Sequence, residues 1–161
     1  MKRGSAPSWP QAALNLELFE MLDKIGEPGS SKATFYELLG GVEKVRDLVE
    51  RFYDVMDSDP KAAGIRAMHG QDLTEAREKL FMFLTGWTGG PQLYIERYGH
   101  PFLRARHLPF AIGESERDQW MYCMVRAMND LGIEEKVMIQ LGNALWDVAD
   151  FMRNRQEQHQ P

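Results

Sequence analysis

The chain has 161 residues, a length that usually corresponds to one domain built around one hydrophobic core. Hydrophobic residues make up 43% and charged residues 27%, which are ordinary values for a globular protein and exclude a chain that is disordered throughout. The formal net charge of −5 argues against nucleic acid as a partner, because a phosphate backbone is bound by clustered lysines and arginines.

The single cysteine, Cys123, limits the chemistry that one chain can build. One thiol cannot form an intrachain disulfide, a zinc site of several thiolates or a Cys-x-x-Cys-His attachment, so a reducing, cytoplasmic environment is expected. The sequence shows no apolar run of about 18 residues and no secretory signal pattern. We therefore expect no membrane partner.

Residues 1–31 are predicted to form an N-terminal extension, followed by a domain at 32–155 and a polar tail at 156–161. Apolar residues recur at helical spacing between Gln11 and Ile25, which predicts a short amphipathic helix packed on the main body. Turn-forming residues at 26–31 separate this helix from the domain. A fraying terminal arm is the alternative.

From Thr34 onward the hydrophobic spacing predicts helices. A helix that starts at Val42 places its apolar residues on one arc, and Tyr53 falls inside that arc, so its hydroxyl is expected to point inward. The other residues of this arc are Val45, Leu48, Val49, Phe52, Val55 and Met56. The next helix has an arc of Leu73, Ala76, Leu80, Phe83, Leu84 and Trp87, with Lys79 at its edge, and ends at Gly89-Gly90-Pro91.

Two more helices complete the domain. One opens near Gly113, where Ser115 and Asp118 are spaced like a capping box, and presents Trp120, Met124, Met128 and Leu131 on one face. The last has a face of Val137, Leu141, Leu145, Val148 and Met152. Since no segment alternates like a strand and no repeat is present, the predicted fold class is all-α in one domain.

Between the second and third of these helices lies a segment, 94–110, that is dense in arginine, histidine and aromatic residues. Pro101 and Pro109 bound a short helix, and His107 is placed at its end. One ring nitrogen there can turn inward while the other donates to a backbone carbonyl, which suits an axial ligand to haem iron. The alternative is a histidine with a structural hydrogen bond. Arg104 and Arg106 favour the haem, because guanidinium groups pair well with propionates.

These residues resemble group II truncated haemoglobins over about Thr34 to Met152. The motifs that carry the resemblance are Gly40-Gly41, Phe52-Tyr53, Lys-Leu-Phe-Met-Phe-Leu before Gly89-Gly90-Pro91, Gly-His-Pro-Phe-Leu-Arg-Ala-Arg-His-Leu-Pro-Phe, and Glu-Arg-Asp-Gln-Trp with Cys123-Met124 behind it. Each motif is weak alone, but their order and spacing are specific. The resemblance implies a two-over-two helical sandwich around haem b, to which the spacing at 11–25 adds an extra N-terminal helix.

The resemblance also implies roles for individual residues. His107 resembles the proximal iron ligand of the family, and Tyr53 and Trp120 resemble its distal tyrosine and tryptophan. His69 falls where the family often has tyrosine or phenylalanine, and it departs from that pattern. The implied haem contacts are Lys79 and Arg106 at the propionates and Leu80, Phe83, Tyr94, Phe102, Leu103, Phe110 and Met124 in the apolar pocket. His100, the rival to His107, has a structural role in the family motif.

The predicted function is reversible binding of dioxygen, or of nitric oxide or carbon monoxide, with hydrogen bonds from Tyr53, Trp120 and a correctly placed His69. One alternative is an enzyme on the same site, a nitric-oxide dioxygenase or a peroxidase, which needs an external reductase. Another is a haem-free helical interaction module, whose methionine-rich faces are only core. The sequence leaves both alternatives open, and it is compatible with a monomer or a homodimer.

Overall fold

The computed structural model describes residues 33–155, where helices are the only regular secondary structure. The helices are α2 (Phe35–Leu39), α3 (Val42–Ser58), the 3-10 helix η1 (Pro60–Ala62), α4 (Ala63–Ala67), α5 (Thr74–Trp87), α6 (Leu93–Tyr98), α7 (Leu103–His107), α8 (Glu114–Asp130) and α9 (Glu135–Phe151). The all-α prediction is therefore confirmed. The helix expected between Gln11 and Ile25 and the tail at 156–161 lie outside the described residues.

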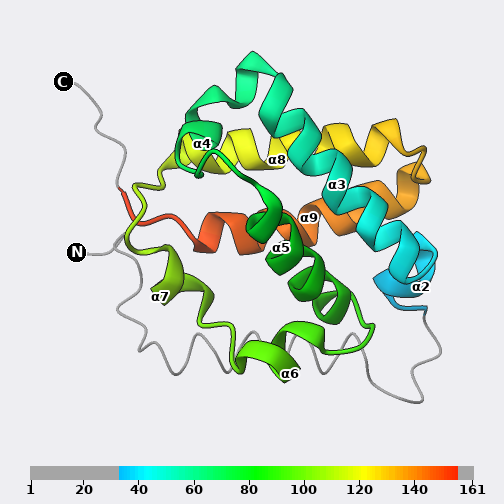
Figure 1. Cartoon of the computed structure of the whole chain (residues 1–161). Coiled ribbons are helices and arrows are strands. Elements are labelled where there is room, and N and C mark those ends of the chain that lie inside the picture. The colour runs from blue at the N-terminus through cyan, green and yellow to red at the C-terminus, as the bar shows by residue number, and fades with distance from the viewer. Residues whose placement is uncertain (1–32, 156–161) are drawn as a thin grey trace, which may run out of the picture.

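Four long helices form two pairs. Helix α3 packs against α5, α8 packs against α9, and the closest contact between the pairs is that of α3 with α8. Figure 1 shows α6 and α7 on the lower side of the molecule, away from the contact of α3 with α8. The core lies between the pairs and includes Phe52, Trp87 and Met128, which are almost completely buried.

Helix α3 matches its sequence prediction closely. All seven residues of the predicted arc, Tyr53 among them, are buried. The turn before the helix is made by Gly40 and Gly41, whose φ angles of 112° and 92° are costly for residues with a side chain. This turn lets α2 fold back beside α3, which explains the glycine pair in the sequence.

Of the arc predicted for α5, Leu73, Leu84 and Trp87 are buried, but the other three residues are not. Ala76, Leu80 and Phe83 were expected in the core but are only half-buried, whereas Phe81 and Met82 are buried. The reason is that α5 packs against both α3 and α6, so its buried surface is wider than one arc. The half-buried residues form a stripe on one face of α5.

The predicted cap of α8 is wrong in detail. The helix begins at Glu114, and the side chain of Glu116, not of Asp118, accepts a hydrogen bond from the Gly113 backbone N–H at 2.7 Å. Ser115 instead accepts from Gln119 Nε2 at 3.0 Å. In the part of the chain that the structure describes, no helix has the length and hydropathy needed to span a membrane.

Candidate functional site

His107 is the last residue of α7, as the flanking prolines predict. Its Nδ1 lies 2.6 Å from the Leu103 carbonyl oxygen. Because a carbonyl can only accept, Nδ1 carries the proton and the neutral ring keeps a lone pair on Nε2. No residue within 33–155 forms a hydrogen bond with Nε2. Burial lowers the pKa of His107, which keeps the ring neutral at pH 7.

Two side chains on either side of His107 tie α7 to the end of α9. Arg104 Nη1 donates to the carbonyl oxygens of Phe151 at 2.8 Å and Arg153 at 2.7 Å. Asn154 Nδ2 donates to the His107 carbonyl at 3.1 Å, and its Oδ1 accepts from the Ile112 N–H at 3.0 Å. These bonds fix a helix of only five residues that buries none of its own side chains. The sequence gives no sign of the role of Asn154.

The rings of Tyr53 on α3 and Trp120 on α8 both pack against the ring of Phe52. The Phe52 ring centroid is 4.9 Å from that of Tyr53 and 5.0 Å from that of Trp120. Burial raises the pKa of the Tyr53 phenol above its ordinary value, so the group stays protonated. Among the described residues, none accepts a hydrogen bond from Tyr53 Oη or Trp120 Nε1. The structure therefore brings together two donors that remain available.

His69 follows α4 and faces the same region. Its ring centroid is 5.9 Å from that of Tyr53, and Nδ1 lies 2.8 Å from the Ile65 carbonyl oxygen. The neutral ring therefore carries its proton on Nδ1 and can only accept at Nε2. The predicted donor role of His69 thus applies only to its doubly protonated form. Burial is the main cause that lowers the pKa of His107, and the neighbouring His69 lowers it further.

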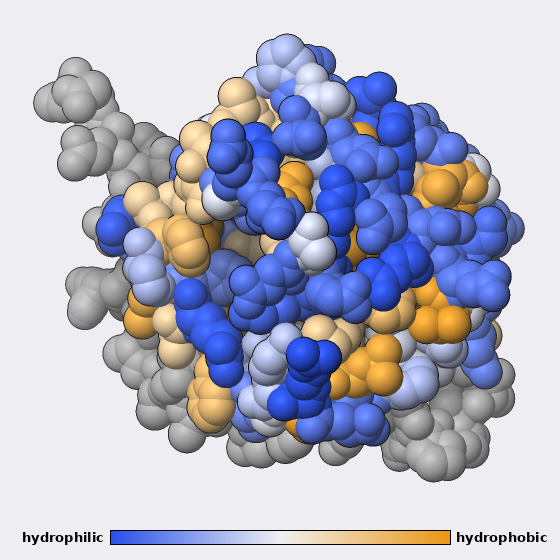
Figure 2. Space-filling model, viewed as in Figure 1, coloured by the Kyte–Doolittle hydropathy of each residue, from blue (hydrophilic) through white to orange (hydrophobic). Residues whose placement is uncertain are grey.

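Apolar side chains surround this space without closing it. The stripe on α5 is half-buried, and around His107 the exposed fractions are 42% for Phe102, 51% for Leu108 and 43% for Phe110. Phe102 also has a φ of 45°, a left-handed conformation that costs free energy for a residue with a side chain. Figure 2 shows a hollow in the surface between α5 and α7, with apolar residues on its left rim.

The other residues predicted to contact haem differ in burial and in their hydrogen-bond or ion-pair partners. Lys79 pairs with Glu75 at 3.0 Å on the same helix, and Arg106 is exposed, with Nε donating to the Pro101 carbonyl at 2.9 Å. Leu103 is half-buried, Tyr94 is buried with its ring centroid 6.4 Å from that of Phe83, and Met124 is fully buried. His100 packs its ring 5.0 Å from Phe102. Arg104 donates to the backbone carbonyls of Phe151 and Arg153, at the end of α9 and just after it.

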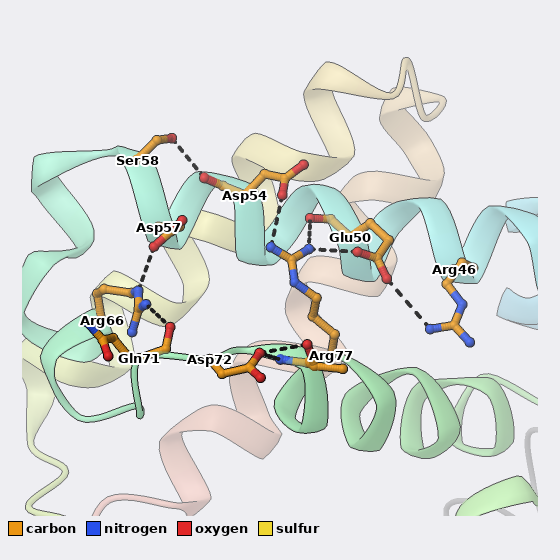
Figure 3. Close-up of polar contacts among 10 residues, drawn as sticks. Arg46, Glu50, Asp54, Asp57, Ser58, Arg66, Gln71, Asp72 and Arg77 are labelled. Carbon is orange, nitrogen blue, oxygen red and sulfur yellow. Dashed lines mark hydrogen bonds and ion pairs between the residues drawn. The ribbon is translucent and has the colours of Figure 1, made fainter.

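Sequence reasoning missed a polar clamp that holds the Tyr53 side of the site together (Figure 3). Arg77 of α5 donates to the Glu50 carboxylate at 2.7 Å and to the Asp54 carboxylate at 3.0 Å, both on α3, and its guanidinium lies 5.8 Å from the Tyr53 ring. Arg46 of α3 joins Glu78 of α5 by two hydrogen bonds. Such long-range charge pairs have no signature in the spacing along the chain.

Comparisons with known proteins agree with this fold. Residues 34–154 match the family model described as bacterial-like globin. Group 2 truncated hemoglobin YjbI of Bacillus subtilis is 40% identical over 129 residues, which span 80% of this chain and 95% of that protein. Two solved structures are also similar. The group II 2-on-2 hemoglobin of Agrobacterium tumefaciens has a TM-score of 0.75 and 42% identity, over 80% of this chain and 99% of that chain. The truncated oxygen-avid haemoglobin of Bacillus subtilis has a TM-score of 0.69 and 40% identity, over 75% and 99%.

The Asn154 contacts generate the first prediction. Asn154→Ala removes the acceptor of the Ile112 N–H, and a lost hydrogen bond of about 1 kcal/mol corresponds to roughly fivefold less protection of that amide. Hydrogen exchange followed by NMR measures this change. Asn143→Ala, at an exposed position of α9, is the matched control and should leave Ile112 unchanged. Equal protection of Ile112 in both variants would show that Asn154 does not hold the segment.

Proposed function

Because the chain belongs to the bacterial-like globin family, as a group II truncated haemoglobin, we propose that it binds haem b through His107 Nε2 and holds a diatomic ligand beside Tyr53 and Trp120. Haem-based binding of small ligands is the function that membership of this family supports. The observation that carries the residue assignment is the hydrogen bond from His107 Nδ1 to the Leu103 carbonyl. It leaves Nε2 of a neutral imidazole free to bind a metal.

The residues around the hollow fit a porphyrin. The half-buried stripe on α5 and the exposed Phe102 and Phe110 near α7 offer apolar surface to a flat, mostly apolar ring from two sides. Covering such side chains is favourable by about 25 cal/mol per Å² of apolar area. The strained backbone of Phe102 is consistent with a functional position, because strain persists where it serves a site.

The propionates require cations near the edge of the hollow. Arg106 is the better placed, because it is exposed and only its Nε has a described partner. Lys79 can exchange its partner Glu75 for a propionate, since an exposed ion pair within one helix contributes little. We base this part of the proposal on Arg106 and Lys79, because Arg104 Nη1 is engaged by α9.

Bound haem supplies reversible coordination of a diatomic gas, and the protein supplies the polarity around that gas. Tyr53 Oη and Trp120 Nε1 donate from two different helices, so both can point at the outer atom of one ligand. A ligand whose outer atom carries negative charge, such as dioxygen, gains from these donors, and carbon monoxide gains less. The described similarity to an oxygen-avid haemoglobin supports dioxygen as the ligand.

Substituting His107 tests the proposed ligation. His107→Ala should reduce bound haem at least about tenfold after reconstitution with hemin and desalting, because the porphyrin loses its coordinate bond. His100→Ala should keep the absorption band. His107→Gly with added imidazole controls for misfolding, since free imidazole can replace the missing side chain. A haem band that persists in His107→Ala would rule out His107 as the ligand.

Substituting the donors tests their role. Each hydrogen bond contributes about 1 kcal/mol, so Tyr53→Phe combined with Trp120→Phe should speed dioxygen release by roughly 30-fold. Stopped-flow displacement of dioxygen by carbon monoxide measures this rate. The matched control is Tyr36→Phe with Trp146→Phe, which changes the same residue types on α2 and α9. If the release rate is the same in both double variants, the donors have no part in holding the ligand.

A further inference from the structure

The two histidines at the site make the same kind of hydrogen bond, from Nδ1 to a backbone carbonyl. His69 Nδ1 donates to the carbonyl of Ile65 at 2.8 Å, and His107 Nδ1 donates to the carbonyl of Leu103 at 2.6 Å. In both cases the carbonyl belongs to the residue four positions earlier: Ile65 lies within α4, and Leu103 is the first residue of α7. Both neutral rings therefore present the lone pair of Nε2. This is the tautomer that a metal ion requires when a histidine binds it through Nε2.

The Nε2 atom of His69 has no competing protein partner in the part of the chain that the structure describes. Tyr53 packs beside His69, and the two rings meet edge to face at 5.9 Å without a hydrogen bond. The half-buried His69 ring, which packs beside Tyr53, therefore keeps a lone pair on Nε2 without a described partner.

The segment that carries His69 is held rigidly. Arg66 Nε donates to Asp57 at 2.7 Å, while its Nη1 and Nη2 donate to the carbonyls of Gly70 at 2.9 Å and Gln71 at 3.0 Å (Figure 3). One guanidinium thus ties the turn after α4 to the end of α3. On the other side, Gln119 Oε1 accepts from the Ile65 N–H at 2.9 Å, directly beside Trp120. The His69 ring is therefore placed by three helices and not by a free loop.

We propose that His69 Nε2 occupies the sixth coordination position of the haem iron when no external ligand is present. This inference rests on the proposed function, since it needs haem held by His107. The bond is formed by the Nε2 lone pair and is exchanged for that of an incoming ligand, with no change in oxidation state. Tyr53 and Trp120 then contact the ligand only after His69 has left. Ligand entry is accordingly a two-step process, in which Arg66 is a positioning residue.

Absorption and electron paramagnetic resonance spectra of the ferric protein, reconstituted with hemin, test the proposal. The wild type should give the low-spin signal of two histidine ligands. His69→Ala should lose that signal and become high-spin. His69→Phe, which keeps the ring volume, is the second variant in case alanine disturbs the fold, and it should give the same result. Tyr53→Phe should remain low-spin, because the tyrosine is not the ligand.

Carbon monoxide binding to the ferrous protein is the second readout. In the wild type the observed rate should level off at high gas concentration, at the rate at which His69 leaves. In His69→Ala the rate should rise linearly. Arg66→Gln should lower the low-spin fraction of the ferric protein, whereas Arg46→Gln, which cuts a link between α3 and α5 away from His69, should not.

The outcomes separate this inference from the proposed function. A wild-type protein that retains haem but is high-spin would overturn the role of His69 and leave His107 ligation intact. A low-spin signal that survives in His69→Ala and His69→Phe but is lost in Tyr53→Phe would assign the position to Tyr53 instead. If the wild type binds no haem while its fold is intact, the proposed function itself fails.

Discussion

The hydrogen bond from His107 Nδ1 to the Leu103 carbonyl is the interaction on which the rest of the site depends. It decides which ring nitrogen carries the proton, and so which nitrogen can bind a metal. A five-residue helix has little stability of its own, and the bonds of Arg104 and Asn154 to the end of α9 supply the missing support. The last helix of the fold therefore fixes a ring that lies more than forty residues earlier in the chain.

Tyr53 and Trp120, on the other side of the proposed site, are held by ring packing on long helices. Both aromatic rings pack against the ring of Phe52. The pairing of α3 with α5 is reinforced by Arg77, and the turn that carries His69 is reinforced by Arg66. Each polar group at the site is thus supported by a contact between different helices, which places the groups accurately without a large buried network.

Features that depend on residues close together in the sequence could be predicted, and features that depend on distant residues could not. The burial of α3 and the position of His107 were predictable, because they depend on hydrophobic spacing and on two prolines. The additional burial of Phe81 and Met82 on α5 was not, because it depends on packing against two neighbours at once. The roles of Asn154 and Arg77 were missed for the same reason, since their partners lie far away in the sequence. The tautomer of His69 could be assigned only from the position of the Ile65 carbonyl oxygen, which the sequence does not give.

A crystal structure of the protein reconstituted with hemin, with the iron located by anomalous diffraction, tests the central claim most directly. We expect the iron within coordination distance of His107 Nε2, at about 2 Å, while Nδ1 keeps its bond to the Leu103 carbonyl. An iron bound by another side chain, or a His107 ring turned toward bulk solvent, would contradict the account.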